Sequence, residues 1–278
     1  MRKILLLIST VALLAGVANA QENMMSKRGT PILPEAKDWG LGIDANPILE
    51  FFGNAFNNDN NPAPTWGFET NPMVITGLMV KDANTAYRAK LRLGIGSNKV
   101  TYPVADNTST AIPPAMTNDE VKTGSRNIVI GAGIQKNRGK GRLRGIYGAE
   151  AMICLFGSKT EYTYANAFST TVQAPTTGIP NQIGNFPRTT EDKSGSTFMF
   201  GIRGFIGAEY FFAPKMSVAG EFGWGPSLSS TGEGEITTEN LNTAGNGGTT
   251  TTTKTGKSSD FSFDTDNNGG AIRITFYF

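Results

Sequence analysis

Charged side chains that alternate with apolar ones are the residues of this chain with the most chemistry to offer. In the stretch YRAKLRLGIG, three cations share one face of a strand, because side chains in a strand repeat every two residues. The same split, with carboxylates and glycines on the polar face, recurs in LRGIYGAEAMICL, FMFGIRGFIGAEY and VAGEFGW. The residues assigned to the charged face are Asp44, Glu50, Arg88, Lys90, Arg92, Arg144, Glu150, Arg203, Glu209, Glu221 and Arg273.

Carboxylates in this set could in principle serve acid–base chemistry, with Glu150, Glu209 and Glu221 as the candidates. The chain contains no histidine, however. This removes the His-dependent Ser and Asp mechanisms and the commonest zinc ligand. Mixed charge on one face favours a simpler role, in which buried ions pair with one another. We therefore expect no enzyme, no catalytic residue and no cofactor.

One stretch has the spacing that opens a calcium-binding loop. In DTDNNGG, the oxygen ligands would be Asp264, Asp266 and Asn268. The position that needs a bidentate glutamate is Thr275 instead. The apolar alternation also changes face here, so we interpret these polar residues as a bulge and expect no metal site.

Eight long strands would position the charged residues, and they are connected alternately by short and long segments. KDANT, NRGKGR and FAPKM are short, whereas the other connections are long and rich in Asn, Thr, Pro and Gly. This pattern predicts an all-β fold, a transmembrane antiparallel up-and-down β-barrel with short periplasmic turns and long extracellular loops. Closure pairs every backbone group, as hydrocarbon requires. The expected strands are roughly 39–52, 72–81, 85–102, 125–138, 142–164, 195–212, 216–229 and 259–278.

The N-terminus indicates export. MRKILLLISTVALLAGVANA has a basic start, a short apolar run and a small-residue ending, which predicts a signal peptide over residues 1–20. Residues 21–38 would form a periplasmic segment and 39–278 the barrel, so we expect localisation in the outer membrane. Removal of the signal peptide takes away two basic residues and leaves 23 basic and 23 acidic residues. A net charge near zero gives no support for nucleic-acid binding. A lone cysteine, Cys154, excludes an internal disulfide.

Aromatic residues are expected in two girdles at the borders of a bilayer, which makes outer-membrane lipid a predicted partner. A soluble sandwich or barrel with these aromatics in its core is the alternative. The girdle residues are Trp39, Tyr87, Tyr210, Trp224 and Phe198. The last strand, AIRITFYF, places Ile272, Ile274, Phe276 and Phe278 on one apolar face.

These features resemble those of the small outer-membrane β-barrels of the OmpA/OmpX type. In that family the terminal aromatic strand is the signal for the barrel-assembly machinery, so the resemblance implies this partner during biogenesis for the strand ending at Phe278. The stretch SKRGTPILPEAKDWGLGIDANPILEFFGNAFN is similar to the N-terminal region of a family of Bacteroidota outer-membrane proteins. There an ILPE segment followed by a Trp-Gly strand opens the barrel. Neither resemblance implies an activity.

The expected function is therefore non-enzymatic, a structural or interaction role that includes that of an accessory subunit in a larger envelope complex with protein partners. Side chains fill the interior of an eight-stranded barrel, so we expect a plugged lumen. Two alternatives stay open: a narrow porin-like channel for small solutes or ions, and a carboxylate-dependent outer-membrane enzyme. The sequence leaves the roles of residues 21–38 and of the Thr/Gly-rich segment 240–259 undecided.

Overall fold

The computed structural model describes residues 24–45, 75–184, 186–265 and 271–278. Within these ranges the chain is built from strands, and the one helical segment is a short 3-10 turn, η1 (Pro180–Gln182). No helix in this described part has the length and apolarity that a membrane crossing requires. The strands are β1 (Trp39–Asp44), β2 (Ile75–Asp82), β3 (Thr85–Ala105), β4 (Met116–Arg138), β5 (Leu143–Thr163), β6 (Arg188–Lys193), β7 (Thr197–Ala213), β8 (Met216–Thr231), β9 (Glu235–Leu241), β10 (Gly248–Lys254), β11 (Ser258–Thr265) and β12 (Ala271–Tyr277).

Eight of these strands close into an antiparallel ring in the order β1, β2, β3, β4, β5, β7, β8 and β12. The ring closes where β12 pairs with β1, from Gly40 opposite Tyr277 to Asp44 opposite Arg273. Beside this ladder, Trp39 and Phe278 exchange two backbone hydrogen bonds of 2.9 and 2.8 Å. The expectation of an all-β, antiparallel fold with an eight-membered ring is confirmed.

The alternation of side chains decides which face of each strand points into the ring. On β3, Arg88 is 3% exposed, whereas its neighbour Tyr87 is 40% exposed. The same alternation continues around the ring, with buried polar residues inside and large apolar residues outside. All five aromatics assigned to the girdles are exposed on the outer face, namely Trp39, Tyr87, Tyr210, Trp224 and Phe198.

The final strand differs from the expectation of one element over residues 259–278. It is divided into β11 and β12, which pair in succession with β8. Thr265 lies opposite Trp224 and Ala271 opposite Glu221, so the final segment has more residues than β8 over the same stretch. The expected bulge falls on residues 266–270, outside the described residues, but the apolar side chains are outside on both sides of them: Phe261 is exposed before and Phe276 after. Asp264 lies at the end of β11, while Asp266 and Asn268 fall outside the described residues.

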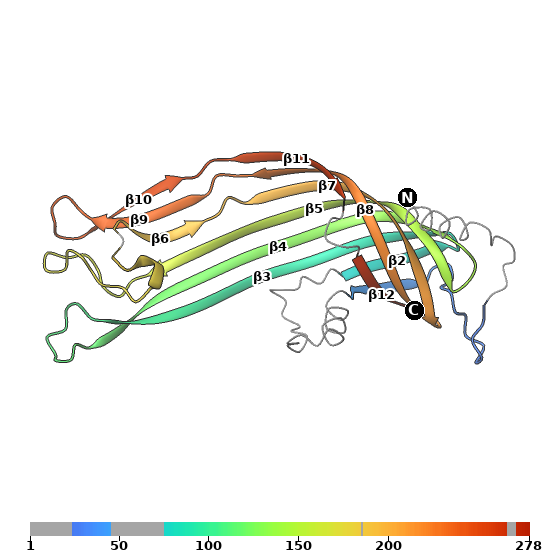
Figure 1. The fold of residues 1–278 in the computed structure, drawn as a ribbon, viewed down its shortest axis with the longest axis horizontal. Coiled ribbons are helices and arrows are strands. Elements are labelled where there is room, and N and C mark those ends of the chain that lie inside the picture. Colours follow the sequence, from blue (N-terminus) through green and yellow to red (C-terminus); the bar gives the residue numbers. More distant parts are fainter. Residues whose placement is uncertain (1–23, 46–74, 185, 266–270) are drawn as a thin grey trace, which may run out of the picture.

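The sheet continues far beyond the ring, which the sequence analysis did not predict. Strands β3, β4 and β5 run on as one curved sheet, and β6, β9 and β10 join its β5 edge (Figure 1). Two of the segments expected as long loops, near 103–124 and 230–258, are therefore mostly strand, and the segment near 165–194 contains the short strand β6. The first of them is a hairpin in which Ala105 pairs with Met116.

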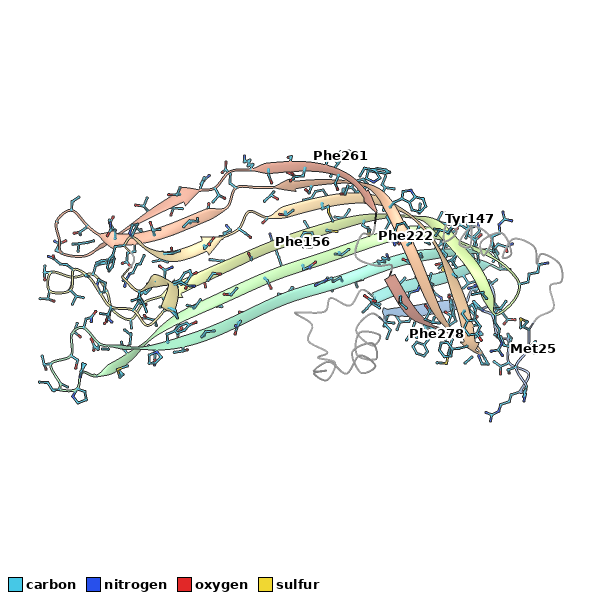
Figure 2. All side chains as sticks on the ribbon, in the orientation of Figure 1. Met25, Tyr147, Phe156, Phe222, Phe261 and Phe278 are labelled. Atoms are coloured by element: carbon cyan, nitrogen blue, oxygen red, sulfur yellow. The ribbon has the colours of Figure 1, made fainter. Side chains whose placement is uncertain are left out.

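The short-turn end of the ring is covered by the segment that precedes β1. Ile32 is buried against inward-facing Leu78, Phe211 and Tyr277, and together they form an apolar core. The backbone carbonyl of Ile32 accepts a 2.9 Å hydrogen bond from the amide of Lys215 in the β7–β8 turn. Met25 and the C-terminal Phe278 lie at this same end (Figure 2). Residues 24–38 thus pack onto the ring.

Candidate functional site

Six charged side chains from five strands meet inside the ring, and we call them the central cluster. They come from β3, β5, β7, β8 and β12, and each occupies an inward position of its strand. Glycines on β4 make room for them, since a Cβ added at Gly133 would lie 2.6 Å from the Cβ of Glu150. The members of the central cluster are Arg88, Lys90, Glu150, Arg203, Glu221 and Arg273.

The two carboxylates of the central cluster are shared by four cations. Arg88 donates two parallel hydrogen bonds to Glu221, of 2.9 and 3.0 Å, in the bidentate geometry that makes such pairs strong. Arg203 Nη1 bridges the carboxylates, at 3.0 Å from Glu150 Oε1 and 3.1 Å from Glu221 Oε1. Lys90 Nζ lies 2.5 Å from Glu150 Oε1. This sharing compensates part of the desolvation cost that burial imposes on each ion.

Arg273 joins the central cluster from the closing strand. Its Nη1 is 3.6 Å from Glu221 Oε2, its Nε donates to Thr275 Oγ1 at 3.1 Å, and its Nη2 donates to Gln135 Oε1 at 3.4 Å. Asp44 is its cross-strand neighbour on β1. The charged network therefore reaches β12, the strand that closes the ring.

Two of the guanidinium groups lie near one aromatic ring. The ring centroid of Phe205 lies 4.2 Å from Arg88 Cζ and 5.7 Å from Arg203 Cζ, and both distances suit a cation–π contact. Phe205 is absent from the residues that sequence reasoning selected. Its position gave a usable signal, since it shares the parity of Arg203 and Glu209 in FGIRGFIGAEYFF.

A second, smaller cluster lies nearer the short-turn end. Arg144 donates to Glu209 Oε2 through Nε at 3.0 Å and Nη2 at 2.9 Å. The other oxygen of Glu209 accepts hydrogen bonds from Ser217 Oγ at 2.7 Å and from Tyr277 OH at 2.9 Å. Arg144 also lies 4.7 Å from the centroid of the Phe211 ring. Every acceptor oxygen of this buried carboxylate is thus occupied.

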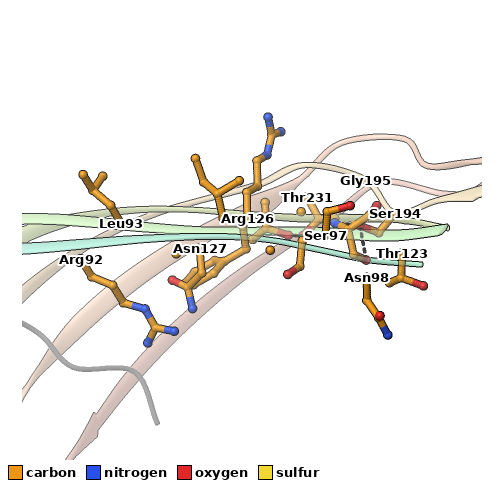
Figure 3. A pocket seen from close by; sticks show the side chains of 18 residues that line it. Arg92, Leu93, Ser97, Asn98, Thr123, Arg126, Asn127, Ser194, Gly195 and Thr231 are labelled. Atoms are coloured by element: carbon orange, nitrogen blue, oxygen red, sulfur yellow. Dashed lines mark hydrogen bonds between the residues drawn. The ribbon is translucent and has the colours of Figure 1, made fainter. Parts of the chain in front are cut away.

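Eight of the eleven side chains assigned to the charged face take part in these two clusters. Arg92 faces the same interior but shares no ion pair with them among the described residues. Asp44 lies at an inward position opposite Arg273, and Glu50 falls outside the described residues. Beyond the central cluster, a hollow of about 950 Å3 includes Arg92 and Asn127, whose side chains point to one side of the sheet in Figure 3.

No protein-family model, curated protein or solved structure matches this chain. What the site can do chemically is therefore inferred from its geometry alone.

That geometry suits structural ion pairing better than acid–base work. Glu209 has hydrogen bonds to both oxygens, and Glu221 accepts three from two arginines. Glu150 Oε2 accepts no hydrogen bond in the described structure, but it lies 3.4 Å from Arg88 Nε. The described residues also contain no group of three or more His, Cys, Asp and Glu side chains arranged to hold a metal ion.

A separate polar core organises the far end of the sheet. Buried Asp119 accepts hydrogen bonds from the amides of Ala165 and Gly178 and from the hydroxyl of Thr177. Arg188 Cζ lies 4.2 Å from the centroid of the Tyr164 ring, and Arg188 Nη1 donates a hydrogen bond to the carbonyl of Asn166. Burial raises the pKa of Tyr164, although the positive charge of Arg188 opposes this. These contacts hold the segment between β5 and β6 against the sheet.

Proposed function

We propose that this protein is an outer-membrane β-barrel whose lumen is plugged and whose role is structural or interactive rather than catalytic. The observation that carries the proposal is the division of the ring into an apolar outer face and an ion-paired inner face. In water this arrangement would expose large hydrophobic residues while burying charged ones, which is the reverse of what a soluble protein needs.

The height of the apolar outer face supports a membrane setting. It extends from Tyr87 to Ile95 on β3 and from Leu143 to Leu155 on β5. These spans of roughly 9 and 13 residues correspond to about 30–43 Å of strand at ~3.3 Å per residue. A tilt of about 40° reduces this to ~23–33 Å, comparable with the apolar band of ~25 Å in outer-membrane barrels. Beyond Ile95 the outer face of β3 becomes polar, with Lys99 paired to Glu120 at 2.6 Å.

Two features support a plugged lumen. The central cluster crosses the interior with side chains that are nearly all inaccessible to solvent. Residues 24–38 then cover the short-turn end through the apolar core around Ile32. Planar-bilayer recordings test this: we expect purified protein to insert without giving stable, reproducible current steps. Regular steps of one amplitude would contradict the plug.

A narrow channel is the second candidate, favoured by the excess of cations over carboxylates around Glu150 and Glu221. Lys90, the most accessible member of the central cluster, has a side chain 15% exposed. If the ring conducts, the current should be anion-selective and should change when Lys90 is replaced by Met. The carboxylate-dependent enzyme is not proposed, because no observation favours it.

The interaction role is tested by recovering the tagged protein from its native outer membrane in a mild detergent. A partner at constant stoichiometry, measured by mass spectrometry, is expected for an accessory subunit. Recovery of the protein alone would contradict the accessory role and leave a free-standing barrel. The outer-membrane location, and biogenesis through the barrel-assembly machinery by way of the strand ending at Phe278, belong to the same proposal.

A further inference from the structure

A hollow on the outer face of the sheet lies where the apolar surface gives way to charged residues. Its volume is about 330 Å3, and we call it the outer hollow. Arg126 points to the same side of the sheet as outward-facing Leu93 and away from Arg92 and Asn127, which places it outside the ring (Figure 3). Residues lining the outer hollow include Ile95, Arg126, Gly157, Lys159, Lys193 and Ser196.

The outer hollow is cationic. Three cations line it, and no carboxylate is among its described lining residues. Lys159 and Lys193 lie directly opposite each other on β5 and β6. Like charges in such cross-strand positions repel each other and destabilise the pairing. Carboxylates outside the hollow offset this repulsion, since Lys159 pairs with Glu161 at 2.7 Å and Glu191 at 3.0 Å, and Lys193 pairs with Glu235 at 3.5 Å. Arg126 is the cation of the hollow that pairs with no carboxylate among the described residues.

Arg126 extends from β4 past Gly157 of β5 to Ser196. Its Nη2 donates to Ser196 Oγ at 2.5 Å, a neutral partner that leaves its charge uncompensated there. A glycine permits this position, because a Cβ added at Gly157 would lie 3.0 Å from Arg126 Nε. Guanidinium, ammonium and hydroxyl groups together match the oxygens of a phosphate.

The surface next to the outer hollow is strongly apolar. Ile95, which lines it, is 82% exposed, and Leu93 follows at 67% on the same strand. Leu155 and Phe198, which face each other on β5 and β7, are also exposed there. A phosphate bound in the hollow would therefore have hydrocarbon-compatible surface beside it.

We propose that the outer hollow binds the phosphorylated headgroup of a membrane lipid, whose acyl chains lie along the apolar face around Leu93 and Ile95. This inference rests on the proposed membrane location and adds a ligand class to it. A phosphate that carries acyl chains should bind better than a free phosphate, because only the acylated one contacts both the outer hollow and the apolar surface beside it.

Binding to the purified protein in dodecyl maltoside micelles tests the inference with three probes. Dioleoyl phosphatidic acid carries both the phosphate and the acyl chains, dioleoylglycerol lacks the phosphate, and inorganic phosphate lacks the chains. We expect phosphatidic acid to bind about tenfold more tightly than dioleoylglycerol, as one charge-assisted contact of ~1.4 kcal/mol implies. It should also bind at least about tenfold more tightly than inorganic phosphate, which has no acyl chains to cover the apolar surface. Equal affinity for dioleoylglycerol, or for inorganic phosphate, would overturn the proposal.

Two variants locate the binding site. Arg126→Gln removes the charge and Gly157→Leu fills the space, so each should weaken phosphatidic acid binding about tenfold. Lys254→Gln is the matched control, since Lys254 is an exposed cation on distant β10 that pairs with Glu233. An equal loss in this control, or no loss with Arg126→Gln, would reject the site.

Flotation with phosphatidylcholine vesicles after carbonate extraction separates the two proposals. A protein that does not float contradicts the membrane location and, with it, the lipid site. A protein that floats but shows no preference for phosphatidic acid contradicts the lipid site alone.

Discussion

Glu221 is the carboxylate on which the central cluster most depends, and Glu221→Gln should destabilise the protein severely. Glu221 accepts three hydrogen bonds from Arg88 and Arg203. It also lies within 3.8 Å of Lys90 and 3.6 Å of Arg273. A glutamine accepts through one oxygen only and turns N–H donors toward a guanidinium, so it breaks the bidentate pair with Arg88. Glu150 is then the one carboxylate left in the central cluster to compensate its four cations.

The expected cost follows from the burial of these groups. Removing one partner of a buried ion pair costs ~3–5 kcal/mol, because the remaining charge stays desolvated. At a denaturant dependence of ~2 kcal/mol per molar urea, the unfolding midpoint should fall by ~1.5–2.5 M. Urea titration in detergent micelles can follow this through the fluorescence of Trp39 and Trp224, which are exposed on the outer face.

Lys90→Met provides the matched comparison. Glu150 retains contacts with Arg203 at 3.0 Å and Arg88 at 3.4 Å after this change. The charge imbalance also becomes smaller, so we expect a loss below ~1 kcal/mol. Combining Lys90→Met with Glu221→Gln should recover part of the lost stability. Equal losses for the two single variants, or a midpoint shift below ~0.5 M for Glu221→Gln, would refute the reasoning.

Three further changes test other parts of the molecule. Gly148→Ala should prevent folding, because its Cβ would lie 2.8 Å from the Phe205 ring and collide with the backbone carbonyl of Ile134. The electrophoretic mobility of the unheated sample measures this. Ile32→Ala should lower the free energy of unfolding in micelles by ~2–3 kcal/mol, whereas Ile95→Ala, at an exposed site, should not change it. Arg188→Met should speed limited proteolysis between β5 and β6 about tenfold, with no change in the urea midpoint of the ring.

The charged interior was predictable because strand periodicity and burial energetics act together there. Arg88 and Lys90 alternate with apolar residues, and a buried face with both signs of charge must pair internally. Phe205 could have been found by the same parity. Which cation meets which carboxylate could not, since Arg88 and Glu221 are joined only through the order and register of the ring.

The extension of the sheet was not predictable for a different reason. β10 has the sequence GTTTTTK and is exposed along its entire length, so no apolar face distinguishes it from a polar loop. Its conformation depends on pairing with β9, which in turn pairs with β6. The packing of Ile32 into the ring was not predictable either, because its partners Leu78 and Phe211 are distant in sequence.

The continuous strands β3 and β4 also set the distance between the hairpin tip and the apolar band. From Ile95 to Ala105, ~10 residues at about 3.3 Å each place the tip roughly 33 Å farther along the strand. A flexible tether of this length would lose conformational entropy when its end was captured, but paired strands have already lost it on folding. The tip, where Ile112 is 99% exposed, is therefore held on a stiff spacer, and a partner that meets it would be selected by reach and orientation.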